Sequence, residues 1–262
     1  MADLATQAAF PELSKVDSDA LNRAQRIAMR VRKDFTSAQG SWAVLQNLQR
    51  RIDSNQVFRE AIGRNLPGGL RETCDALYVN TVLGLMRMTD DPGRSDDRES
   101  ACNLAGILSN PKLVVVLNDD RWLTRGSQTS NQNILQFERG EQPRRIGWFL
   151  SVVPMGWEKS DPRPTPDTLG DMRELLRSLR NEVFAHSLAA NGIRVPKPND
   201  ITAGLKLAEK IASHAVMIFM GTNVGLGDSF ESQVQDLGEV WDGLESSQVQ
   251  FHTDWIKQMR QT

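Results

Sequence analysis

Residues 70–88, which read LRETCDALYVNTVLGLMRM, are the stretch that decides the fold. Their apolar side chains, among them Leu77, Val82 and Leu85, lie on more than one side when the stretch is drawn as a helix. A helix that is apolar on several sides is buried among other elements. Pro92-Gly93 follows shortly afterwards and ends the helix, because proline cannot continue it. We therefore expect a helix in the middle of a bundle.

Apolar residues on both sides of this stretch recur at three- and four-residue steps, which indicates amphipathic helices. Asp17 or Ser18 can cap the first of them, and Gly40 is expected to interrupt it. Further helices are expected at residues 21–31, 42–52, 98–108 and 200–218, with a last one towards the C-terminus. The sequence therefore predicts an all-α protein built as a helical bundle.

Two segments do not follow helical spacing clearly. Residues 113–117 read LVVVL, a run that fits either a short strand or a buried turn of helix. Residues 140–170 contain several prolines and are expected to form a loop-rich insertion with little helix. We therefore divide the chain into a helical domain, residues 1–227, which carries this insertion, and a C-terminal helical extension, residues 228–262.

Charge and cysteine content restrict the function. The net charge is −2, so the chain lacks the positive field of a protein that coats nucleic acid, and any RNA contact must be local. Cys74 and Cys102 do not have the spacing of a metal site or a disulfide framework, which fits a reducing compartment. We see no secretion signal and no apolar run long enough to cross a membrane. These features predict a soluble cytoplasmic protein without a membrane segment.

Residues 179–187, LRNEVFAHS, contain the side chains that are best suited to chemistry. His186 titrates near neutral pH, and Arg180 carries a fixed positive charge six residues earlier. An acid–base group and a cation are the least that is needed to grip or cut a phosphodiester without a metal. Arg173 and Arg177 lie on one face of the same predicted helix, where they either follow an RNA backbone or pair with acidic neighbours in solvent. We therefore take this segment as the candidate site.

The context of these residues resembles a known family. Residues 175–186, LLRSLRNEVFAH, look like the signature of the HEPN superfamily, in which an arginine and a polar residue stand shortly before a histidine. The Ala-His-Ser ending is similar to the abortive-infection branch of that family. Residues 77–90, LYVNTVLGLMRMTD, resemble an earlier core helix of the same branch, and residues 200–220 stand where the closing helix of the bundle is expected. The resemblance covers roughly residues 15–222.

This resemblance implies a fold and an activity together. HEPN domains are helical bundles that dimerise so that two arginine–histidine segments face each other, and many are metal-independent endoribonucleases of toxin–antitoxin or phage-defence systems. Arg180 and His186 match the catalytic pair, and Asn181 matches the polar residue beside them. Neither a cofactor nor a metal is implied. The expected partners are RNA, a second copy of the chain and an antitoxin or another defence-system protein.

The spacing of Arg180 and His186 places them on different sides of a straight helix, and a second copy of the chain can bring the two groups together. Six residues at about 100° each place His186 about 120° around a straight helix from Arg180. In a symmetric dimer, the arginine of one chain can complement the histidine of the other. Alternatively, His186 lies on the apolar side of its helix as a core histidine paired with Glu182. The chain would then be a non-catalytic HEPN-like module for dimerisation or regulatory binding.

Three other patterns favour structural roles. Asp119-Asp120 predicts a turn or a helix cap, because no third metal ligand stands at a suitable spacing. His214 lies in an apolar helix and is expected to be a core histidine whose hydrogen bonds are satisfied. Residues 221–227 are rich in glycine and are expected to connect two helices.

Overall fold

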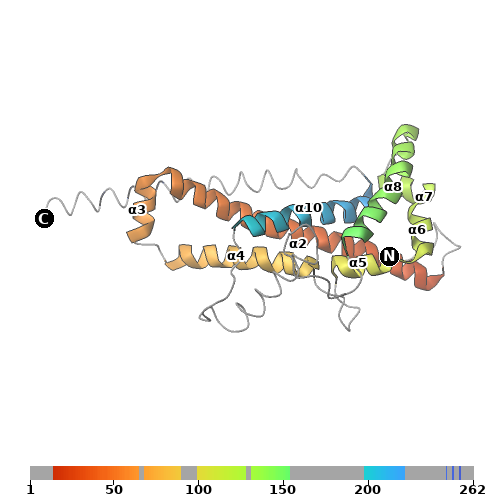
Figure 1. Ribbon diagram of the computed structural model, residues 1–262, viewed down its shortest axis with the longest axis horizontal. Coiled ribbons are helices and arrows are strands. Elements are labelled where there is room, and N and C mark those ends of the chain that lie inside the picture. Colours follow the sequence, from red (N-terminus) through yellow and green to blue (C-terminus); the bar gives the residue numbers. More distant parts are fainter. Residues whose placement is uncertain are drawn as a thin grey trace. The chain divides into compact units, whose positions relative to one another are not determined.

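The computed structural model describes residues 14–64, 68–89, 99–127, 131–153 and 198–221, together with Ser246, Gln250 and Asp254. Within these ranges the chain forms α-helices and no strands, which confirms the all-α prediction (Figure 1). The helices are α2 (Lys15–Ser54), α3 (Gln56–Arg64), α4 (Gly68–Thr89), α5 (Ala101–Leu108), α6 (Pro111–Leu117), α7 (Asp120–Ser127), α8 (Gln132–Val152) and α10 (Pro198–Met220).

The chain separates into two compact units, which we call unit 1 and unit 2. Unit 1 draws on Met1–Phe35 and Gly84–Gly225, and unit 2 on Thr36–Leu83 and Leu226–Thr262. The first half of α2 and the last turn of α4 therefore belong to unit 1, together with α5, α6, α7, α8 and α10. The predicted boundary between residues 227 and 228 lies outside the described residues. Ser246, Gln250 and Asp254 are helical, as expected for a C-terminal helix.

Helix α2 begins earlier and runs longer than the sequence analysis predicted. Its cap is Ser14, whose hydroxyl oxygen accepts a hydrogen bond from the Asp17 backbone N–H at 3.1 Å and donates one to the Asp17 carboxylate at 2.7 Å. The first of these bonds is the N-cap half of a capping box; the Asp17 carboxylate takes the hydroxyl proton of Ser14 in place of its backbone N–H. Gly40 does not interrupt the helix. A helical glycine costs about 1 kcal/mol, which the burial of Ala38 and Trp42 on either side outweighs.

Unit 2 has a small apolar core in which α2, α3 and α4 meet. Val44, Leu48 and Phe58 are buried, and Leu77 of α4 packs against them. Asn80 on α4 also donates hydrogen bonds to two serine hydroxyls of α2, at 2.7 Å and 3.1 Å. The predicted helix at residues 70–88 is thus confirmed, but residues 72–80 are exposed or half-buried. Burial on several sides applies only to the C-terminal half of α4.

Three short helices of unit 1 each begin at a polar cap. Ser100 precedes α5, Asn110 precedes α6, and Asp119 precedes α7, and each side chain accepts a hydrogen bond from a backbone N–H in the first turn. The ambiguous residues 113–117 are therefore helical, because Asn110 caps α6 and Pro111 occupies its first position. Asp119 has the capping role predicted for it.

Helix α8 extends into residues 140–170, where the sequence predicted a loop-rich insertion. Residues 140–152 continue this helix, with Pro143 exposed inside it, so the expectation of little helix is wrong for that part of residues 140–170. A proline inside a helix costs about 3 kcal/mol. Ile146 and Phe149 lie on the buried face, and each contributes about 1.5–3 kcal/mol by burial, which is enough to offset that cost. Residues 154–170 lie outside the described part.

Candidate functional site at the end of helix α10

The residues that the sequence marks for catalysis do not fall in the described part of the chain. Arg173, Arg177, Arg180, Asn181 and His186 all lie between α8 and α10, in residues 154–197. Their predicted roles stay predictions. The next described element is α10, which begins at Pro198 and agrees with the predicted helix at residues 200–218. The best-formed polar site of the described residues lies at the other end of this helix.

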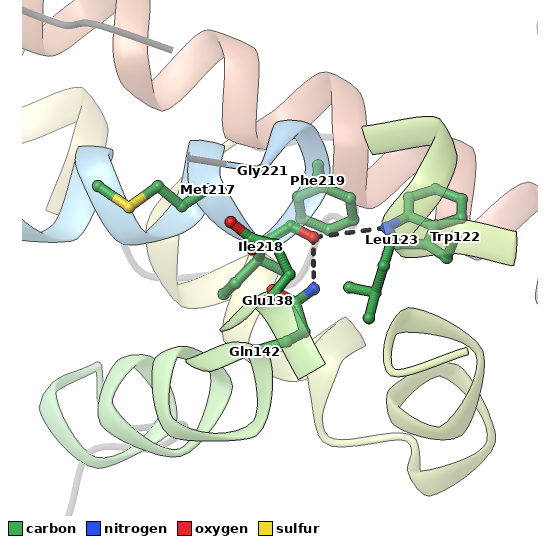
Figure 2. A pocket seen from close by; sticks show the side chains of 8 residues that line it. All are labelled: Trp122, Leu123, Glu138, Gln142, Met217, Ile218, Phe219 and Gly221. Atoms are coloured by element: carbon green, nitrogen blue, oxygen red, sulfur yellow. Dashed lines mark hydrogen bonds between the residues drawn. The ribbon is translucent and has the colours of Figure 1, made fainter. Parts of the chain in front are cut away.

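The C-terminal end of α10 is held by side chains from two other helices of unit 1. The last carbonyl groups of a helix have no partner within it. The Ile218 carbonyl accepts hydrogen bonds from Trp122 Nε1 on α7 at 3.4 Å and from Gln142 Nε2 on α8 at 2.7 Å (Figure 2). Gly221 then turns the chain away with a positive φ of 73°, a conformation that favours glycine. The predicted connector thus begins as a helix C-cap.

Gln142 is the central residue of this junction. Its side-chain amide also donates to the Leu117 carbonyl of α6 at 3.3 Å. Both partners are carbonyl oxygens, so the atom that faces them must be the nitrogen. The amide oxygen is buried without a hydrogen-bond partner among the described residues. Gln142 therefore joins α6, α8 and α10 through one amide group.

A small recess lies beside this junction. Its lining includes Trp122, Glu138, Gln142 and Phe219, and the Trp122 and Phe219 rings meet edge to face with centroids 6.2 Å apart (Figure 2). The recess has a volume of about 10 Å³, which is about the space that one water molecule needs. Ligand pockets are usually about 300–1,000 Å³. The recess is thus too small for a nucleotide or a metabolite.

Glu138, which lines the recess, belongs to a buried ion pair. Glu138 and Arg145, two turns apart on α8, approach to 2.5 Å, and their side chains are 1% and 7% exposed. Charges that are removed from water at this depth are tolerated only as a pair. The two residues fall where the sequence was expected to form a loop, and only their spacing of seven on a helix could have indicated the pair.

His214 lies about one turn before Ile218 on α10 and is half-buried against α8. Its Nδ1 bonds to the Lys210 carbonyl at 2.8 Å, so Nδ1 carries the proton in the neutral ring. Its ring stacks on Trp148, with centroids 3.9 Å apart. Burial lowers the pKa of His214, and the charges of Arg145 and Lys210 lower it further, although the hydrogen bond to the Lys210 carbonyl opposes them. His214 therefore has a hydrogen bond at Nδ1, as predicted for a satisfied histidine, but it is half-buried and not part of the core. The lowered pKa favours its neutral form.

The described residues do not gather metal ligands into a cluster. They hold no group of three His, Cys, Asp or Glu side chains placed to bind a metal ion. None of their helices is both long and apolar enough to span a membrane. The junction at α10 is thus a polar joint between helices. No protein-family model, curated protein or solved structure matches the chain.

The buried pair predicts unequal effects of single and double substitutions. Glu138→Gln leaves the Arg145 charge buried and uncompensated, so we expect the free energy of unfolding to fall by about 3–5 kcal/mol. Glu138→Leu combined with Arg145→Met should lose much less. Glu141→Gln is the matched control, because Glu141 pairs with the exposed Arg144 and should cost about 0–1 kcal/mol. Urea denaturation at neutral pH measures all four proteins, and equal losses for Glu138→Gln and Glu141→Gln would contradict the assignment.

The lowered pKa of His214 predicts a pH dependence of stability. As pH falls below the ordinary histidine pKa of 6.5, the unfolded chain binds a proton before the folded chain does. The free energy of unfolding should therefore decrease with falling pH. His214→Asn keeps a donor for the Lys210 carbonyl but cannot titrate. Urea midpoints at about pH 7.5 and about pH 5.5 should fall further for the wild type than for this variant; the same fall in both would exclude His214 as the source.

Proposed function

We propose that the protein is a metal-independent endoribonuclease of the HEPN type. The observation that carries the proposal is the sequence Arg180-Asn181, followed after four residues by His186, in a stretch whose apolar spacing predicts a helix. Two findings support it: the described residues are helical throughout the predicted bundle, and α10 follows the arginine–histidine segment where a closing helix is expected. The proposed substrate is RNA, and the proposed unit of activity is a homodimer.

The chemistry needs only three side chains and the RNA. The 2′-hydroxyl attacks the neighbouring phosphate, and the bond to the 5′-oxygen breaks, which leaves a 2′,3′-cyclic phosphate and a 5′-hydroxyl end. His186 takes the proton of the nucleophile or gives one to the leaving oxygen. Arg180 holds two phosphate oxygens as negative charge develops on them. Asn181 orients one of these two groups.

A toxin or phage-defence effector is the proposed biological role. The net charge of −2 disfavours indiscriminate binding of bulk RNA and favours a structured RNA or one delivered by a partner. An antitoxin or another defence-system protein is the proposed regulator, because an unregulated ribonuclease would harm its own cell.

Cleavage without metal is the first consequence of this proposal. The purified protein should cut RNA in excess EDTA and leave 2′,3′-cyclic phosphate ends. His186→Ala should lower the rate by about 10²–10⁴, the usual contribution of an acid–base group. Gel electrophoresis of end-labelled RNA with analysis of the termini measures both effects.

A second histidine of the chain supplies the matched control. His214→Asn changes a histidine that is held by Lys210 and stacked on Trp148, so cleavage near neutral pH should stay close to that of the wild type. Cleavage that persists in His186→Ala, or that requires added metal, would refute the mechanism. Equal losses in both histidine variants would show that the effect comes from folding.

Mixed dimers test whether two chains share one site. If Arg180 of one chain acts with His186 of the other, a dimer of Arg180→Ala and His186→Ala chains retains one intact site of two. Half of the dimers in an equal, re-equilibrated mixture are of this kind, so the mixture should recover about one quarter of the wild-type rate. Each variant alone should be inactive. A mixture as inactive as its components would place both residues of a site on one chain.

A non-catalytic binding module is the second candidate function. It is favoured by the net negative charge and by the sequence spacing, which predicts His186 on the apolar side of a helix. In that case, alanine at Arg180 and His186 would weaken folding or self-association, and the wild type would release no RNA fragments. Light scattering of the wild type and of both variants, run beside the cleavage assay, separates the two candidates.

A further inference from the structure

A line of positive charge follows the N-terminal half of α2 in unit 1. Arg23, Arg26, Arg30 and Lys33 are spaced by three or four residues. At about 100° per residue they lie within an arc of about 80° on one side of the helix. Leu21, Ala24, Ile27, Ala28 and Val31, which face the core, are fully buried. We call the four cationic residues, Arg23, Arg26, Arg30 and Lys33, the basic stripe.

The basic stripe faces solvent. Arg26 and Lys33 are exposed, and Arg23 is partly exposed. The stripe extends over eleven residues, which is about 15 Å from the first cation to the last and roughly 5 Å between neighbours. A strand of nucleic acid carries one phosphate per about 3.4 Å of helix axis, so the same length holds about four phosphates. An extended polyanion can therefore meet several of these cations at once.

A buried carboxylate fixes a fifth cation beside the stripe. Asp34 is 4% exposed, and its two oxygens bind Arg30 Nε at 3.1 Å and Arg87 Nε of α4 at 3.3 Å. The side chains of the two arginines remain 40% and 44% exposed. A guanidinium has five N–H donors, and a contact through Nε uses one of them. Asp34 thus positions two arginines whose remaining donors can serve a phosphate.

The charge of this face is strongly positive, although that of the chain is not. The basic stripe and Arg87 supply five cations, and on the described part of α2 the carboxylates on or beside this arc are those of Asp34, which is buried, and Asp19, which is exposed one turn before Arg23. Among the described residues, Arg23, Arg26 and Lys33 form no ion pair. Cations that are left without acidic partners on one face are the usual electrostatic footprint of a nucleic-acid surface.

We propose that the basic stripe and Arg87 bind the phosphate backbone of RNA. The choice of RNA over another polyanion rests on the proposed function. That function assigns residues to the scissile phosphate only, and the basic stripe would bind the neighbouring phosphates of the same RNA. Four of the five cations are arginines, which bind phosphate in bidentate fashion. The contacts reach phosphates and not base edges, so binding should depend on salt and little on sequence.

Binding of a single-stranded oligonucleotide of about 20 nucleotides with 2′-O-methyl groups tests the proposal. This probe has no 2′-hydroxyl nucleophile, so the proposed reaction cannot consume it. In the full chain, Arg26→Gln combined with Lys33→Gln removes two exposed cations. Affinity at about 0.1 M salt should fall roughly tenfold or more, and the slope of log affinity against log salt should fall by about 1.4. Fluorescence anisotropy across a salt series measures both quantities.

Lys112→Gln combined with Lys206→Gln is the matched control. Both lysines are exposed in unit 1, on α6 and α10, and their loss changes the net charge by the same amount. Equal weakening by the two double variants would overturn the proposal, because only the net charge would then matter. Polyglutamate that displaces the probe at equal charge concentration would also overturn it, in favour of an acidic protein partner.

The cleavage assay keeps this proposal separate from the proposed function. Probe binding that depends on the basic stripe, in a protein that cuts no RNA, would uphold the surface and refute the ribonuclease. Cleavage of RNA by a protein whose probe binding ignores Arg26 and Lys33 would refute the surface and leave the ribonuclease standing.

Discussion

The last carbonyl groups of α10 must accept hydrogen bonds from outside their helix, and this requirement organises the part of unit 1 around them. The Ile218 carbonyl is buried, so water cannot supply the missing donors. Trp122 of α7 and Gln142 of α8 supply them, and Gln142 also reaches the Leu117 carbonyl of α6. Four helices are therefore tied to one another at two backbone oxygens. A bundle whose contacts were only apolar would allow these helices to slide.

Polar groups beside this joint add specificity at an energetic cost. The Glu138–Arg145 pair and the neutral His214 both lie between α8 and α10, where apolar residues of similar size would be less costly to bury. Both are satisfied within their own helix, because Glu138 and Arg145 lie on α8, and Nδ1 of His214 bonds to the Lys210 carbonyl of α10. The contacts that cross between the helices are the stack of His214 on Trp148 and the hydrogen bond from Gln142 to the Ile218 carbonyl. These two contacts favour one register of α8 against α10 over its neighbours.

The sequence predicted helices where local signals and tertiary packing agree. The Asn110-Pro111 pair marks the start of α6 and could have decided between strand and helix for residues 113–117. Gly40 and Pro143 are local signals for an interruption, and both lie inside continuous helices because buried neighbours on each side outweigh their cost. The joint at Ile218 could not be predicted, because its members are distant in sequence and are brought together only by the fold. The arginine–histidine segment shows the opposite case, since its evidence is the sequence pattern alone.

The chain carries a small net negative charge, but positive charge is concentrated at the basic stripe and Arg87. The net charge of −2 discourages contact with polyanions in general, whereas the N-terminal half of α2 carries the basic stripe on one side and turns its apolar residues inward. Asp34 makes this separation possible. As a buried carboxylate it needs cationic partners, and by holding Arg30 and Arg87 it draws two positive charges to the same place without cancelling them both. A carboxylate that stabilises the fold therefore also concentrates positive charge at its surface. The proposed RNA surface requires no excess of basic residues in the rest of the chain, so a net charge of −2 limits where RNA can bind and does not exclude it.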